Sequence, residues 1–150
     1  MRKMLLIGAV CFVALIAWTG IAFSQTAASG AIKMFKLPSG ESVFDISGEW
    51  DVLVENYDAF SHFGTYRQLY KITQEGNLFT GIRLKDSPPP AFAKAGSKCM
   101  QGEIDKSGVK KLDFIFAPWD IWPSNCKISE DGNKITIDSP QKTRLTLTRK

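Results

Sequence analysis

The chain has 150 residues, of which 44% are hydrophobic and 23% charged, and its formal net charge at pH 7 is +4. This length suits one domain with a substantial core. So small a basic excess gives no electrostatic case for nucleic-acid binding, which needs a clustered basic face.

Residues 1–24 carry the pattern of a secretory signal. Arg2 and Lys3 precede an unbroken apolar run from Met4 to Trp18, and the small residues Ala22 and Ser24 form an A-x-S cleavage pattern. Cleavage leaves 126 residues with a net charge of +2. We expect a signal helix that is removed on export, and hence a periplasmic or secreted protein. If the segment stays uncleaved, it is the only part of the chain expected to touch a membrane.

Residues 25–45 form a mixed lead-in, in which Ile32–Leu37 is either a short strand or extended chain, and a β-barrel domain is expected over residues 46–150. From Ile46 onward, short runs of β-branched and aromatic residues alternate with Gly, Asn, Asp and Pro clusters, which is typical of a sandwich or barrel. The sequence predicts eight strands: Glu49–Glu55, Tyr66–Gln74, Leu78–Lys85, Cys99–Asp105, Val109–Phe116, Cys126–Ser129, Lys134–Asp138 and Thr143–Arg149.

The connections between these strands alternate in kind. Tight turns that contain Gly follow the second, fourth and sixth strands, whereas long connections span residues 56–65, 86–98 and 117–125. In an up-and-down meander every second connection lies at the same end. We therefore predict an all-β fold, an eight-stranded antiparallel up-and-down barrel with a closed tight-turn end and a loop-rich mouth. A β-sandwich is the alternative.

Side-chain alternation gives each strand an apolar inward face. Trp50 faces inward at the start of the first strand, and Arg149 faces inward at the end of the last. These two strand ends meet at the tight-turn end. Arg149 is therefore expected either to lie over the Trp50 indole as a cation–π pair or to fray into solvent at the chain end.

Three short features resemble the calycin group, which comprises lipocalins, avidins and bacterial secreted lipocalin-like proteins. They are Gly48-Glu49-Trp50 opening the first strand, an arginine closing the last, and the hairpin sequence Ile72–Gly81. The resemblance spans roughly residues 45–150. It implies a barrel whose Trp and Arg seal the closed end and whose mouth admits a small apolar or amphipathic ligand, but it names no ligand.

Two cysteines remain after cleavage, Cys99 and Cys126. An even pair in an oxidising compartment favours a disulfide, with two buried free thiols as the alternative. Their strands lie two places apart, about 9–10 Å in a regular sheet, whereas a disulfide holds Cα atoms near ~5.5 Å. The bond therefore requires one cysteine to leave the ladder and bend over the rim.

The long loops are rich in aromatic residues, which crowd the mouth if the barrel forms and mark a binding surface or lid. We predict an exported small-ligand-binding barrel for an apolar or amphipathic molecule, with no cofactor. The alternative is a protein-interaction module, or an inhibitor of a secreted enzyme, that presents the same loops over a solid interior, with Trp119, Trp122 and Phe92 as anchors. Another interpretation gives the loops no binding role and has Trp119 and Trp122 plug the barrel top as a small second core. The candidate ligand-binding residues are Val52, Val54, Tyr57, Phe60, Phe63, Tyr70, Phe92, Phe114, Phe116, Trp119 and Trp122.

The sequence contains no catalytic constellation that we can identify. His62 has Ser61 beside it and Asp58 nearby, but neighbours in a loop do not make a triad. It also has no Cys or His at ligand spacing, so no metal site is expected. An enzyme is therefore the third hypothesis.

Overall fold

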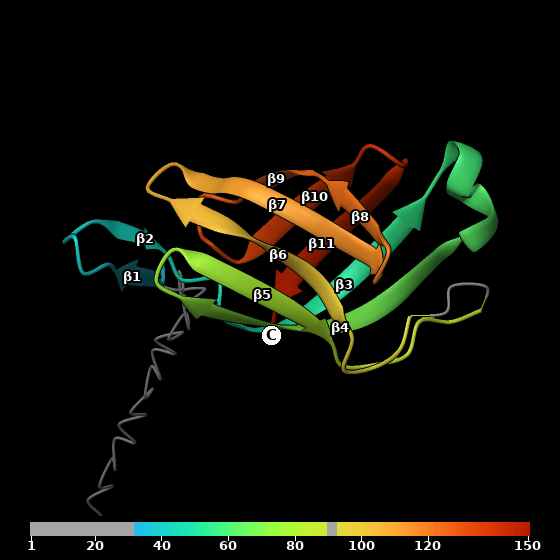
Figure 1. Cartoon of the computed structure of the whole chain (residues 1–150), viewed down its shortest axis with the longest axis horizontal. Coiled ribbons are helices and arrows are strands. Elements are labelled where there is room, and N and C mark those ends of the chain that lie inside the picture. Colours follow the sequence, from blue (N-terminus) through green and yellow to red (C-terminus); the bar gives the residue numbers. More distant parts are fainter. Residues whose placement is uncertain (1–31, 90–92) are drawn as a thin grey trace, which may run out of the picture.

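The computed structural model describes residues 32–89 and 93–150. The predicted signal at 1–24 and the candidate Phe92 lie outside these residues. Nine strands form one antiparallel sheet that curls into a nearly closed barrel, an all-β architecture compatible with a calycin-like fold (Figure 1). Within the two described ranges, no helix is both long and apolar enough to span a bilayer.

The eight predicted strands are confirmed, each to within two residues at either end. In the sheet the strand order is β8-β7-β6-β5-β4-β3-β11-β10-β9, so the pairing of β11 with β3 joins the two ends of the meander. The bounds are β3 Gly48–Asn56, β4 Thr65–Glu75, β5 Leu78–Arg83, β6 Lys98–Asp105, β7 Gly108–Ala117, β8 Asp120–Pro123, β9 Asn125–Ile128, β10 Lys134–Ser139 and β11 Thr143–Arg149.

The predicted count of eight strands is wrong by one, because β8 lies within the stretch expected to be a long loop. This four-residue strand pairs with β7, with Trp122 opposite Phe114. Its shortness and its terminal Pro123 conceal it in the sequence, since proline is unusual in strands. β7 also contacts β9, and Ser124 N donates a 2.9 Å bond to Leu112 O. The barrel therefore closes at this seam without a continuous ladder.

The lead-in contains a hairpin of its own. β1 (Met34–Lys36) and β2 (Ser42–Phe44) form a separate two-stranded sheet, which settles the open question over this segment. The hairpin lies beside the tight turns that join β4 to β5 and β6 to β7 (Figure 1). Val43 and Ile46 are 0% and 1% exposed within the core, so this hairpin adds a layer over the closed end.

The cation–π pair at the closed end is confirmed. Arg149 Cζ lies 4.5 Å from the Trp50 ring centroid. Its guanidinium also donates to Ser47 O at 2.8 Å, to Asp45 O at 2.6 Å and to Gly132 O at 3.4 Å. Arg149 therefore joins the last strand to the segment before the first strand and to the β9–β10 turn.

The opposite end carries the long connections. A short 3-10 helix, η1 (Asp58–Phe63), follows β3, and the connection from β5 to β6, here called the 84–97 connection, is described at residues 84–89 and 93–97. Both lie at the same side of the molecule as the β7–β8 turn, away from the β1–β2 hairpin (Figure 1). The predicted separation of a tight-turn end from a loop-rich mouth is confirmed.

Replacing Arg149 tests the seal at the closed end. Arg149→Ala removes the stacking on Trp50 and three carbonyl bonds, and should lower the free energy of unfolding by about 2–3 kcal/mol. Urea denaturation followed by tryptophan fluorescence measures the change. Arg144→Ala is the matched control on the same strand, since its ion pair with Asp138 is exposed and contributes little. Equal destabilisation by the two substitutions would contradict the role given to Arg149.

Candidate functional site

The interior of the barrel is filled with side chains. Four predicted ligand-binding residues, Val52, Val54, Tyr70 and Phe114, are at most 3% exposed and belong to the hydrophobic core. They pack against other core residues and do not line the pocket described below. A ligand site in this molecule therefore has to be sought above the packed interior, at the mouth.

An aromatic cluster closes the top of the core. Trp122 is 4% exposed, and its ring stacks on Phe116 with centroids 5.3 Å apart. Phe60 meets Trp122 edge-on at 5.5 Å, and Phe63 meets Phe116 edge-on at 5.5 Å. Trp122, from the third predicted loop, thus plugs the top of the core, and Phe60 from the first predicted loop packs against it.

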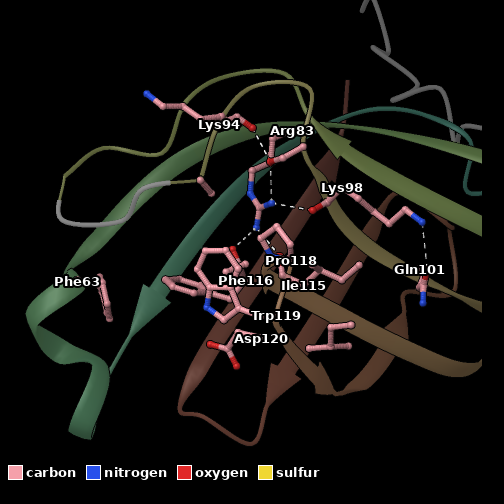
Figure 2. A pocket seen from close by; sticks show the side chains of 14 residues that line it. Phe63, Arg83, Lys94, Lys98, Gln101, Ile115, Phe116, Pro118, Trp119 and Asp120 are labelled. Atoms are coloured by element: carbon pink, nitrogen blue, oxygen red, sulfur yellow. Dashed lines mark hydrogen bonds between the residues drawn. The ribbon is translucent and has the colours of Figure 1, made fainter.

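A pocket of about 740 Å³ lies at the rim, between the 84–97 connection and the β7–β8 hairpin (Figure 2). Its volume falls within the ~300–1,000 Å³ usual for small-molecule sites. All three predicted loops contribute to it. The apolar lining is Phe63, Ala93, Ile115, Phe116, Ala117, Pro118, Trp119 and Ile121, and the polar lining is Arg83, Lys94, Ser97, Lys98, Gln101 and Asp120.

The pocket brings together only some of the predicted residues. Phe63, Phe116 and Trp119 line it, and Trp119 is 87% exposed. Phe60 packs against the core, and Tyr57 is exposed outside the pocket lining. Trp119 is therefore the largest exposed apolar side chain available at the pocket.

Arg83 is the buried charge of the site. It is 3% exposed and faces inward at the mouth end of β5. Nη1 donates to Ser97 Oγ at 3.1 Å and Lys98 O at 2.9 Å, whereas Nη2 donates to Ile115 O at 2.6 Å and Phe116 O at 3.5 Å. Arg83 thus bonds carbonyls of β6 and β7 where these strands diverge at the rim (Figure 2).

Gln68 ties the 84–97 connection to the barrel. Its Nε2 donates to Asp86 O at 3.1 Å and to Ser87 Oγ at 3.0 Å. Gln68 Oε1 is buried and has no hydrogen-bond partner among the described residues. Farther along, Asp86 accepts bonds from Ala95 N at 2.8 Å and Lys94 Nζ at 3.0 Å, and these bonds lower the pKa of its carboxyl group. These bonds join the two ends of the connection to each other and to β4.

The predicted disulfide is not formed in this structure, in which Cys99 and Cys126 are free thiols. Cys126 stays in its ladder opposite Ile137. Cys99 does leave its ladder, but at a β-bulge, since Gly81 pairs with Met100 and Ile82 with Lys98. A bulge turns two successive residues to one face, so Cys99 is buried in the core rather than bent over the rim.

Thiol chemistry tests this arrangement. Burial raises the pKa of both cysteines to about 12. At pH 8 a folded thiol is then about a thousandfold less ionised than one in the unfolded chain, because the thiolate is favoured only above the pKa. Iodoacetamide labelling, read by mass spectrometry, should be slow in the native protein and complete after unfolding without reductant. Cysteines that resist labelling even after unfolding would instead form the disulfide.

His62 takes part in the packing of η1. Its ring lies 4.1 Å from that of Phe63, and Nδ1 is 3.1 Å from Ala59 O. Among residues 32–89 and 93–150, no three His, Cys, Asp or Glu side chains group as metal ligands would. His62 therefore has a packing role in η1.

Comparison of this chain with protein-family models, with curated proteins and with solved structures finds no match. The site has to be interpreted from its own geometry and charge.

Sequence reasoning missed the polar half of the pocket. Phe79, Gly81 and Arg83 alternate along one strand, so parity alone places Arg83 on the inward face. That signal was available in the sequence. Lys98 and Gln101 could not be found this way, because they join the pocket through the bulge at Cys99 and the unpredicted strand β8.

Proposed function

We propose that this chain is an exported small-ligand-binding barrel of calycin-like type, which holds an apolar or amphipathic molecule in the rim pocket. The observation that carries the proposal is the pocket itself, about 740 Å³ in volume, with a lining drawn from all three mouth connections. Export is proposed from the basic and apolar pattern of residues 1–24.

The lining suits an apolar body. Trp119 and Ile121 expose 87% and 48% of their surface, and both come from the β7–β8 hairpin. Such exposure leaves apolar area that a ligand can remove from water, at roughly 25 cal/mol per Å². Phe116, held against the Trp122 plug, supplies a rigid aromatic wall beside them.

The proposed binding mode differs from a ligand enclosed in the barrel. The core residues below the plug leave the interior packed, so the ligand would lie on the rim and be covered by Trp119 and the 84–97 connection. The calycin-like proposal therefore concerns the architecture and the use of the mouth, and not a deep central cavity.

A second candidate function is favoured by the same exposed tryptophan. A protein-interaction module would present Trp119 to a partner as an anchor, over a barrel whose interior is already filled. The two candidates differ in what Trp119 contacts: a small molecule in the pocket, or a protein surface outside it.

A neutral apolar probe tests the proposed function. N-Phenyl-1-naphthylamine should gain fluorescence on binding to the purified protein, and Trp119→Ala should weaken this binding about tenfold, because the indole contributes much of the removable apolar surface. The matched control is Leu78→Ala, which removes an apolar side chain that is 58% exposed and does not line the pocket.

The outcomes of this titration separate the two candidates. Probe binding that depends on Trp119 and not on Leu78 supports the rim pocket as a ligand site. Absence of probe binding, together with a protein partner that is lost from Trp119→Ala but retained by Leu78→Ala, supports the interaction module and contradicts the ligand-binding proposal.

A further inference from the structure

Arg83 carries a buried positive charge that no carboxylate in the chain neutralises. The ion pairs of the described residues all join other side chains and none includes Arg83. Residues 1–31 and 90–92, which lie outside the described ranges, contain no Asp or Glu. No acidic side chain from those segments can therefore supply the missing partner.

The carbonyl bonds of Arg83 explain its position but leave its charge in place. Its four Nη hydrogens are used by Ser97, Lys98, Ile115 and Phe116. Neutral acceptors satisfy hydrogen bonds, yet a charge removed from water remains costly until an opposite charge approaches. Such a charge at the wall of an open pocket is a place where an anion gains more than it would in water.

The charged side chains that line the pocket are mostly positive. Arg83, Lys94 and Lys98 line it against a single carboxylate, that of Asp120. Asp120 accepts a hydrogen bond from the neutral Trp122 Nε1 and keeps its charge, whereas Lys94 is paired with Asp86, so Arg83 and Lys98 outnumber the one carboxylate of the lining. Lys98 Nζ has a neutral contact, Gln101 Oε1 at 3.3 Å, so its charge remains available at the pocket wall.

We propose that the ligand of the rim pocket is an amphipathic anion, with its acid group held near Arg83 and Lys98 and its apolar body against Trp119 and Ile121. This inference rests on the proposed function and deepens it. The acid group is a carboxylate, sulfonate or phosphate, since all three carry the negative charge that Arg83 attracts through its own charge and to which Lys98 Nζ can donate a hydrogen bond. In the view of Figure 2, Arg83 and Lys98 lie above Pro118 and Trp119, so the lining has a charged part and an apolar part, as a ligand with one charged and one apolar end requires.

Three ligands with the same ten-carbon chain test the charge requirement. Isothermal titration calorimetry compares decanoate, decanesulfonate and 1-decanol on the purified protein. We expect both anions to bind at least tenfold more tightly than the alcohol. The sulfonate separates charge from carboxylate geometry, and the alcohol keeps the apolar body without the charge.

Substitutions locate the preference. Arg83→Gln should reduce the anion-to-alcohol ratio at least fivefold while the affinity for decanol is retained. Because Arg83 also bonds β6 and β7, its replacement could disturb folding, so Lys98→Glu provides a second variant at an exposed position. Lys98→Glu should reduce the same ratio about threefold, and the matched control Lys127→Glu, exposed on β9 and outside the pocket lining, should leave it unchanged.

The results distinguish the two proposals. Equal binding of decanol and decanoate, or equal effects of Lys98→Glu and Lys127→Glu, overturns the anion assignment and leaves the ligand-binding function standing. Failure of all three ten-carbon ligands and of N-phenyl-1-naphthylamine to bind contradicts the ligand-binding function itself.

Discussion

The pairing of β11 with β3 is the constraint on which the rest of the molecule depends. These strands come from the two ends of the barrel domain, and their ladder runs from Thr143 opposite Asn56 to Arg149 opposite Trp50. All neighbouring strands of the sheet are antiparallel, and the chain reverses direction at every connection except that between β8 and β9, which run in the same direction. The glycine-containing turns from β4 to β5, from β6 to β7 and from β9 to β10 lie at the Arg149 end, and the long connections lie at the other end together with the short β10–β11 turn.

Each end of the barrel is finished by an arginine that bonds backbone carbonyls. Arg149 does so at the closed end, where it also stacks on Trp50, and Arg83 does so at the mouth. In both places strands stop pairing and leave carbonyl groups that need donors, which the buried guanidinium of Arg83 and the partly buried guanidinium of Arg149 supply. The two ends differ in what lies beyond: the β1–β2 hairpin at the closed end, and the rim pocket at the mouth.

The sequence predicted the features that depend on local alternation and turn chemistry. The eight strands and the position of the mouth follow from side-chain parity and glycine turns, which act over a few residues. Parity also placed Trp50 and Arg149 on the inward face at one end, but left open whether they would pair or Arg149 would fray. Prediction from the sequence failed where the register between neighbouring strands changes. The bulge at Cys99 and the short strand β8 depend on how three strands fit together, and no pattern in 98–101 or 120–123 announces that fit. The pocket inherits both irregularities, so three of its apolar residues could be predicted and its flanking Lys98 and Gln101 could not.

Because side chains fill the interior, the residues that stabilise the barrel differ from the exposed residues that line the pocket. Trp122 belongs to the core, and Phe116, which stacks on it, lines the pocket. Trp119 and Ile121 lie in the β7–β8 turn and on β8, an end strand of the sheet that pairs only with β7. Their replacement alters the shape presented to a visiting molecule without opening a void among the packed strands, where a void would be costly. A scaffold divided in this way can acquire new binding preferences at its rim while its folding determinants stay untouched.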